Sequence, residues 1–117
     1  MRFVNIQTIV AGDIASNING GAVDASLLFY ASVQGVAAGS SPVGTIKLQG
    51  SNDHLAASNL VANTTPTNWS DIATVSVNAV GAFLIPKTGL CYQWIRAIYV
   101  ATSGSGTISV NIQALGQ

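Results

Sequence analysis

The sequence has 117 residues and carries four basic and four acidic side chains, so its formal net charge is zero. This balance excludes the basic footprint needed to bind nucleic acid or an anionic membrane surface, and no stretch is long and apolar enough to cross a membrane. Hydrophobic residues make up 49% of the chain and charged residues 7%, which favours association with other proteins. We expect residues 1–117 to form a single domain with one core.

The first predicted strand spans residues 4–10, and a stretch rich in Gly, Ala and Asn follows at 11–22. Ile14 and Ile18 are its only large apolar residues, so this stretch has little reason to fold firmly by itself. Residues 1–22 are therefore a candidate N-terminal arm that orders on a partner's surface, with Ile14 and Ile18 as anchors. The alternative is an ordinary long loop or an irregular edge strand.

Further strands are predicted at 27–36, 44–50, 72–77 and 81–85, with loops at 37–42 and 51–70 and a turn at 86–89. The loop at 51–70 holds the sole histidine, His54, for which a solvated position is expected because no second imidazole accompanies it. Trp69 in the same loop has two interpretations. It folds back to cap one end of the domain, or it stacks on a sugar ring of a glycan ligand.

The predicted strand at 91–100 has apolar side chains on both faces, unlike a half-buried strand. One interpretation is a central strand whose second face is covered by loops. The other is a subunit interface formed by Trp94, Arg96 and Ile98, because Trp and Arg are enriched among residues that dominate such contacts. The Ser-Gly repeat at 103–106 predicts a turn, which would make 91–100 and the last strand, 107–114, a β-hairpin.

The last predicted strand has the clearest alternation, with Ile108, Val110 and Ile112 on one face and polar residues on the other. We expect this apolar face to lie in the core together with Ile95 and Ala97. About eight short strands at this spacing predict an all-β fold, an antiparallel β-sandwich of the jelly-roll type.

The sequence offers no constellation of residues for catalysis, a cofactor or a metal. Cys91 is the single cysteine, which excludes an internal disulfide and leaves too few ligands for zinc. The aspartates at 13, 24, 53 and 71 are not spaced like a catalytic pair, although Asn52 and Asp53 keep a calcium ion open as an alternative. No nucleophile elbow occurs, and no Gly-rich turn opens a helix that could cradle a phosphate. We therefore predict that the chain is not an enzyme and needs no cofactor.

Four short motifs resemble a pattern found in small β-sandwich virion proteins of tailed bacteriophages, a scaffold shared with discoidin-like jelly rolls. They are KLQGSND at 47–53, NWSDI at 68–72, YQWIRAIY at 92–99 and SGSGT at 103–107. The resemblance implies a capsid decoration or cement protein that binds the major capsid protein or another virion protein as a homo-oligomer. A tail or neck component and a glycan- or receptor-binding module are the alternatives. The N-terminus lacks the pattern of a signal peptide, so we expect synthesis in the host cytoplasm and a final place in the virion.

Overall fold

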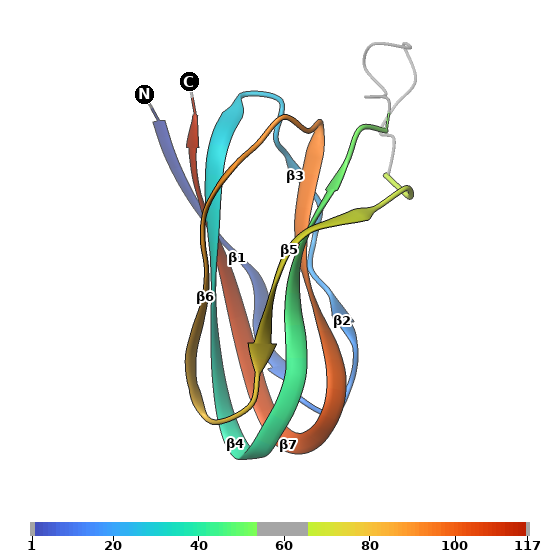
Figure 1. Ribbon diagram of the computed structural model, residues 1–117, viewed down its shortest axis with the longest axis vertical. Coiled ribbons are helices and arrows are strands. Elements are labelled where there is room, and N and C mark those ends of the chain that lie inside the picture. Colours follow the sequence, from blue (N-terminus) through green and yellow to red (C-terminus); the bar gives the residue numbers. More distant parts are fainter. Residues whose placement is uncertain (1, 54–65, 117) are drawn as a thin grey trace.

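The computed structural model describes residues 2–53 and 66–116, and His54 lies outside these ranges. Within them every regular element is a strand, and no helix able to span a membrane occurs. All the strands belong to one antiparallel sheet (Figure 1), which confirms the prediction of an antiparallel all-β chain. The strands are β1 (Arg2–Asp13), β2 (Ile18–Asn19), β3 (Val23–Asp24), β4 (Leu28–Ser51), β5 (Ser70–Val77), β6 (Gly81–Gly89) and β7 (Trp94–Gly116).

Two long strands, β4 and β7, organise the sheet. They pair with each other along their whole length, from Leu28 opposite Gly116 to Ser51 opposite Trp94. Figure 1 shows both strands turning back at the same end of the molecule, so the sheet doubles over on itself. Each bend carries the chain from one layer to the other, and the pairing, irregular at Ser41 and Pro42, resumes with Val43 opposite Ser103.

Glycines at the bend make the close approach of the two strands possible. Gly39 and Gly106 lie opposite each other with φ of +131° and +133°, a region that side chains other than glycine rarely adopt. A Cβ atom on Gly106 would collide with the carbonyl oxygen of Ala38, and one on Gly39 with the carbonyl oxygen of Ser105. Glycine is therefore required at both positions by conformation and by space.

The bend corrects two sequence predictions. Residues 91–100 and 107–114 do not form a hairpin, because the strand parts of both ranges belong to β7 and pair with β4. The predicted loop at 37–42 also lies within β4. In each case a Gly- and Ser-rich segment indicates a reversal of the chain, but here the reversal is shared by two strands already paired with each other.

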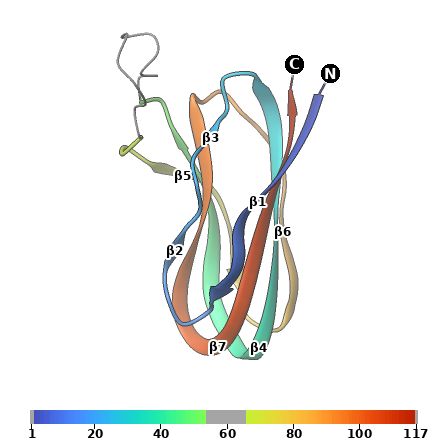
Figure 2. The ribbon, with the colours of Figure 1, turned by 180° about the vertical axis from the view of Figure 1, so that it is seen from behind.

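Dividing β4 and β7 at the bend gives two layers, seen from opposite sides in Figures 1 and 2. The first layer contains, in order, β1, the C-terminal half of β7, the N-terminal half of β4 and β6. The second contains β2 and β3, the N-terminal half of β7, the C-terminal half of β4 and β5. The free edges of β1 and of β2 and β3 thus lie on the same side of the molecule.

Apolar side chains from both layers form the core. Ile108, Val110 and Ile112 are at most 1% exposed, as the alternation in the last strand predicts. Ile95 and Ala97 from the other half of β7 are also fully buried, although β4 and not a hairpin separates them from the last strand. The core prediction is confirmed because a period of two depends only on the strand itself, whichever strand pairs with it.

Candidate binding surfaces

The candidate arm at residues 11–22 lies against this chain's own sheet. β2 pairs with β7, placing Ile18 opposite Tyr99 and Asn19 opposite Ile98. Ile14 is fully buried, and its carbonyl oxygen accepts a 3.0 Å hydrogen bond from the Tyr99 hydroxyl. Ile18 is half-buried against the same core. In this conformation both predicted anchors pack on their own domain. The edge of β7 and the Tyr99 hydroxyl make the contacts that were expected from a partner protein.

The structure brings Arg96 and Trp69 together on the outer face of the second layer. The guanidinium carbon of Arg96 lies 4.4 Å from the centroid of a Trp69 ring, a cation–π contact. Arg96 Nε donates a 2.8 Å hydrogen bond to Gln49 Oε1, and Gln49 Nε2 donates one of 2.8 Å to Asp71. Lys47 completes the group with a 3.1 Å ion pair to Asp71. We call Lys47, Gln49, Trp69, Asp71 and Arg96 the Arg96 cluster.

The Arg96 cluster holds two basic side chains and one acidic side chain, and Lys47 pairs with Asp71. The hydrogen bond from Gln49 and then the contact with Lys47 lower the pKa of Asp71, so this carboxylate stays ionised at neutral pH. Desolvation lowers the pKa of Arg96. An ionised carboxylate bound to an amide and an ammonium group is suited to fixing neighbouring side chains and not to proton transfer at neutral pH. The cluster is therefore a network of polar contacts in which the Arg96 guanidinium group lies over the Trp69 ring.

The three predicted interface residues differ in exposure. Ile98 is only 8% exposed, and Trp94 and Arg96 are half-buried. The indole N–H of Trp94 donates a 3.3 Å hydrogen bond to the carbonyl oxygen of Asp53. Gln49 and Asp71 were not predicted as residues of this surface. The alternation of polar Lys47 and Gln49 with buried residues was the available signal, but it does not identify the strand that lies alongside.

Trp69 is part of the domain's own packing. Its indole N–H donates a 3.2 Å hydrogen bond to the carbonyl oxygen of Pro66, and Arg96 lies over its ring. One ring face is therefore already in use, which leaves only the opposite face for any sugar.

Asp53 fixes the segment that carries Trp69. Its carboxylate accepts hydrogen bonds from the backbone N–H groups of Thr67 at 2.6 Å and Asn68 at 3.0 Å, and from the Asn68 side-chain amide at 2.8 Å. These bonds, with the backbone N–H of Asn68 contributing most, lower the pKa of Asp53 to about 2. Both carboxylate oxygens are engaged by N–H donors, an arrangement unlike the oxygen ligands of a calcium site.

Acid is expected to release this segment. The folded pKa of Asp53, about 2, lies below its ordinary value of 3.8. The stabilisation is therefore fully present above pH 3.8 and is lost as the pH falls through about 2. Carboxyl ¹³C NMR should give a midpoint near 2 for Asp53, with tryptophan fluorescence changing in the same range. A midpoint near the ordinary value, or an unchanged acid transition in Asp53→Asn, would show that the carboxylate does not hold the segment.

The other two carboxylates also serve local structure. Asp13 accepts a 2.9 Å hydrogen bond from the Ala15 backbone N–H, and Asp24 accepts one of 3.0 Å from Ser26 and one of 3.2 Å from the Gln93 side chain. In residues 2–53 and 66–116 no three His, Cys, Asp or Glu side chains gather where they could hold a metal ion.

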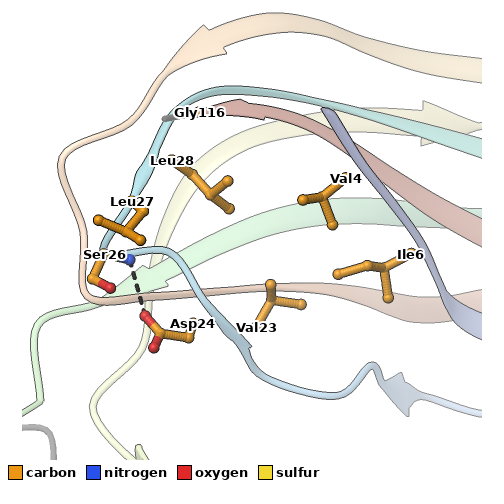
Figure 3. Close-up of a pocket in the computed structure, with 8 residues that line it drawn as sticks. All are labelled: Val4, Ile6, Val23, Asp24, Ser26, Leu27, Leu28 and Gly116. Carbon is orange, nitrogen blue, oxygen red and sulfur yellow. Dashed lines mark hydrogen bonds between the residues drawn. The ribbon is translucent and has the colours of Figure 1, made fainter. Parts of the chain in front are cut away.

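An apolar slot opens beside β1 and β3, at the edge between the two layers (Figure 3). We call it the edge slot, and its volume is about 250 Å³. At its rim the Ser26 N–H donates a 3.0 Å hydrogen bond to Asp24. Leu27 beside them is 56% exposed. Apart from this rim the lining is aliphatic, with Val4 and Ile6 from β1, Val23 from β3, and Leu27 and Leu28.

No protein-family model matches the sequence, and no curated protein matches it either. Three solved structures share the fold. PBSX exported protein XepA is 15% identical with a TM-score of 0.70, and the match covers 97% of this chain but only 37% of XepA. PirA and the SPBc2 prophage-derived protein YomS are each 10% identical, with TM-scores of 0.58 and 0.56. These matches cover 97% of this chain and 93% and 92% of PirA and YomS, respectively.

Proposed function

We propose that this chain is a non-enzymatic structural protein of a bacteriophage particle, a capsid decoration or cement protein that binds the shell as an oligomer. The observation that carries the proposal is the contrast between a nearly uncharged chain and a surface rich in large apolar side chains. Extensive apolar exposure marks surfaces that other proteins cover, and permanent interfaces are the most apolar. Among the described residues, the large hydrophobic side chains that are at least 40% exposed are Phe3, Val10, Leu27, Phe29, Tyr30, Val36, Val80 and Leu84.

The order of strands in the two layers supports a jelly-roll β-sandwich. Counting each half of β4 and β7 separately, and β2 with β3 as one, gives eight segments in chain order. In one layer the order is the first segment (β1), the eighth (second half of β7), the third (first half of β4) and the sixth (β6). In the other layer the order is the second (β2 with β3), the seventh (first half of β7), the fourth (second half of β4) and the fifth (β5). Jelly rolls have this order, and viral capsid proteins use the architecture. The prophage-derived YomS has the same fold, which adds support for a phage origin.

Two surfaces suit contact with the major capsid protein or another virion protein. The edge slot can receive apolar side chains, and Leu27, which lines it, is 56% exposed. The Arg96 cluster offers a half-buried Arg–Trp stack next to Trp94, the residue types that dominate protein interfaces. We infer that residues 1–117 act as one domain with its final place in the virion, and that residues 1–22 contribute to assembly.

Co-sedimentation of the purified chain with phage particles tests the proposal. Leu27→Asp should weaken binding about tenfold or more, because it places a charge at the rim of the apolar slot. Val80→Asp is the matched control, since Val80 is 58% exposed and does not line the slot. Equal binding by both variants would show that the edge slot is not part of the interface. If the chain bound to tails and not to intact heads, the result would favour a tail or neck component. Adjacent genes for the portal and terminase proteins would favour a head protein.

A further inference from the structure

The outer face of the first layer holds a groove rich in uncharged amides. Strand register explains why they gather, because Gln113 lies opposite Asn5 on β1 and opposite Ser32 on β4, while Asn111 lies opposite Gln34. These residues alternate with buried core residues and therefore face outward. They line a cavity of about 180 Å³ together with Leu84 of β6. We call this cavity and the one that adjoins it the amide groove.

Asn111 leaves a hydrogen-bond acceptor unused within the amide groove. Its Oδ1 atom is buried, and no donor from residues 2–53 or 66–116 reaches it. A buried acceptor without a donor is unfavourable, and rotation of the Asn111 side chain toward the cavity that it lines would let a ligand hydroxyl group supply one. Around it, the Asn5 side-chain N–H donates a 2.7 Å hydrogen bond to Gln113, which orients both amides across the strands. The cavity thus offers donors and acceptors without charge.

The adjoining cavity, about 190 Å³, supplies an aromatic surface. It shares Ser32 and Gln113 with the first, so the two cavities lie side by side on this face. Phe3 is 68% exposed at its border. The Lys87 ammonium group lies 4.5 Å from the centroid of the Tyr30 ring, which occupies a face of that ring and leaves Phe3 as the open one. Lys87 is the one charged side chain among the described residues that line the groove.

We propose that the amide groove binds a neutral glycan. One sugar ring would pack on Phe3, and the hydroxyl groups of the next would bond to the side-chain amides of Gln34, Gln113 and Asn111. Aromatic surface beside a few convergent polar groups is the usual chemistry of small-ligand sites, and the lack of charge at the amide end disfavours phosphorylated or acidic sugars. The groove lies on a different face from the Arg96 cluster and shares no lining residue with the edge slot, so a particle contact made through those two surfaces would leave the groove open.

Side-chain amide signals in ¹⁵N NMR report on this site directly. The probes are glucose, galactose, mannose, N-acetylglucosamine, lactose and maltose, each added to about 20 mM because a single small site binds weakly. We expect at least one sugar to shift the amide signals of Gln34, Asn111 and Gln113. Gln34→Ala should weaken that binding about tenfold. Asn78→Ala is the matched control, because Asn78 is an exposed amide that does not line the groove.

Three results would overturn the proposal. The first is no shift with any of the six sugars in a protein whose thermal unfolding is normal. The second is a set of shifts confined to Trp69 and its neighbours, which would assign sugar binding to the Arg96 cluster. The third is movement of the groove amides with protein concentration alone, which would identify a second copy as the occupant. Loss of sugar binding without loss of particle binding would leave the virion proposal intact.

Discussion

Val110→Asp is expected to prevent folding. Val110 is fully buried in the C-terminal half of β7, opposite Ile9 on β1 and Gly35 on β4, so a carboxylate there would have neither water nor a cation beside it. Burying an unpaired charge costs several kcal/mol, which is comparable to the whole stability of about 5–15 kcal/mol of a typical domain. Circular dichroism and chemical denaturation would detect the loss.

Val36→Asp makes the same chemical change on the opposite face of the first layer. Val36 is 48% exposed, so its aspartate would be solvated, and we expect a change in unfolding free energy of about 1 kcal/mol or less. A folded Val110→Asp variant with the stability of Val36→Asp would contradict the assignment of the core face of β7.

Gly106→Ala should destabilise the fold by about 3 kcal/mol or more. Two effects act together at this position, because alanine disfavours φ of +133° and because its Cβ atom would collide with the carbonyl oxygen of Ala38. The collision requires β4 and β7 to move apart at the bend that joins the two layers. The midpoint of urea unfolding is the measurement.

Gly81→Ala separates these two effects. Gly81 also has a positive φ, +145°, but a Cβ atom added there meets no other atom within 4 Å. The Gly81→Ala substitution should lower the free energy of unfolding only by the conformational strain, about 1 kcal/mol. If both variants lost the same stability, the close approach of β4 and β7 at Gly106 would not be the constraint that the structure describes.

Features set by a single strand could be predicted from the sequence, and features set by strand pairing could not. The buried face of Ile108, Val110 and Ile112 follows from local alternation, and the structure has it. The Ser-Gly repeat signals a reversal, but its partner is β4, whose Gly39 lies 67 positions earlier in the chain (106 − 39). No local pattern distinguishes a hairpin turn from a bend shared by two paired strands.

The same reason explains what was missed at the candidate surfaces. Trp69 and Arg96 were assigned to separate interpretations, and they meet because β4 pairs with both β5 and β7. The amides of the groove appear in the sequence only as the polar half of alternating strands, where Asn111 and Gln113 look like ordinary solvated positions. Amides on several strands form one polar face only when the register between the strands is known, and the sequence does not give that register.

The proposed place in the virion is tested most directly by mass spectrometry of gradient-purified phage particles from cells that produce this chain. A structural protein that binds through apolar and uncharged surfaces should remain with the particles in many copies through a wash with about 1 M salt, because screening weakens charged contacts far more than apolar ones. We predict that retention. A chain that is abundant in the lysate but absent from the washed particles would contradict it.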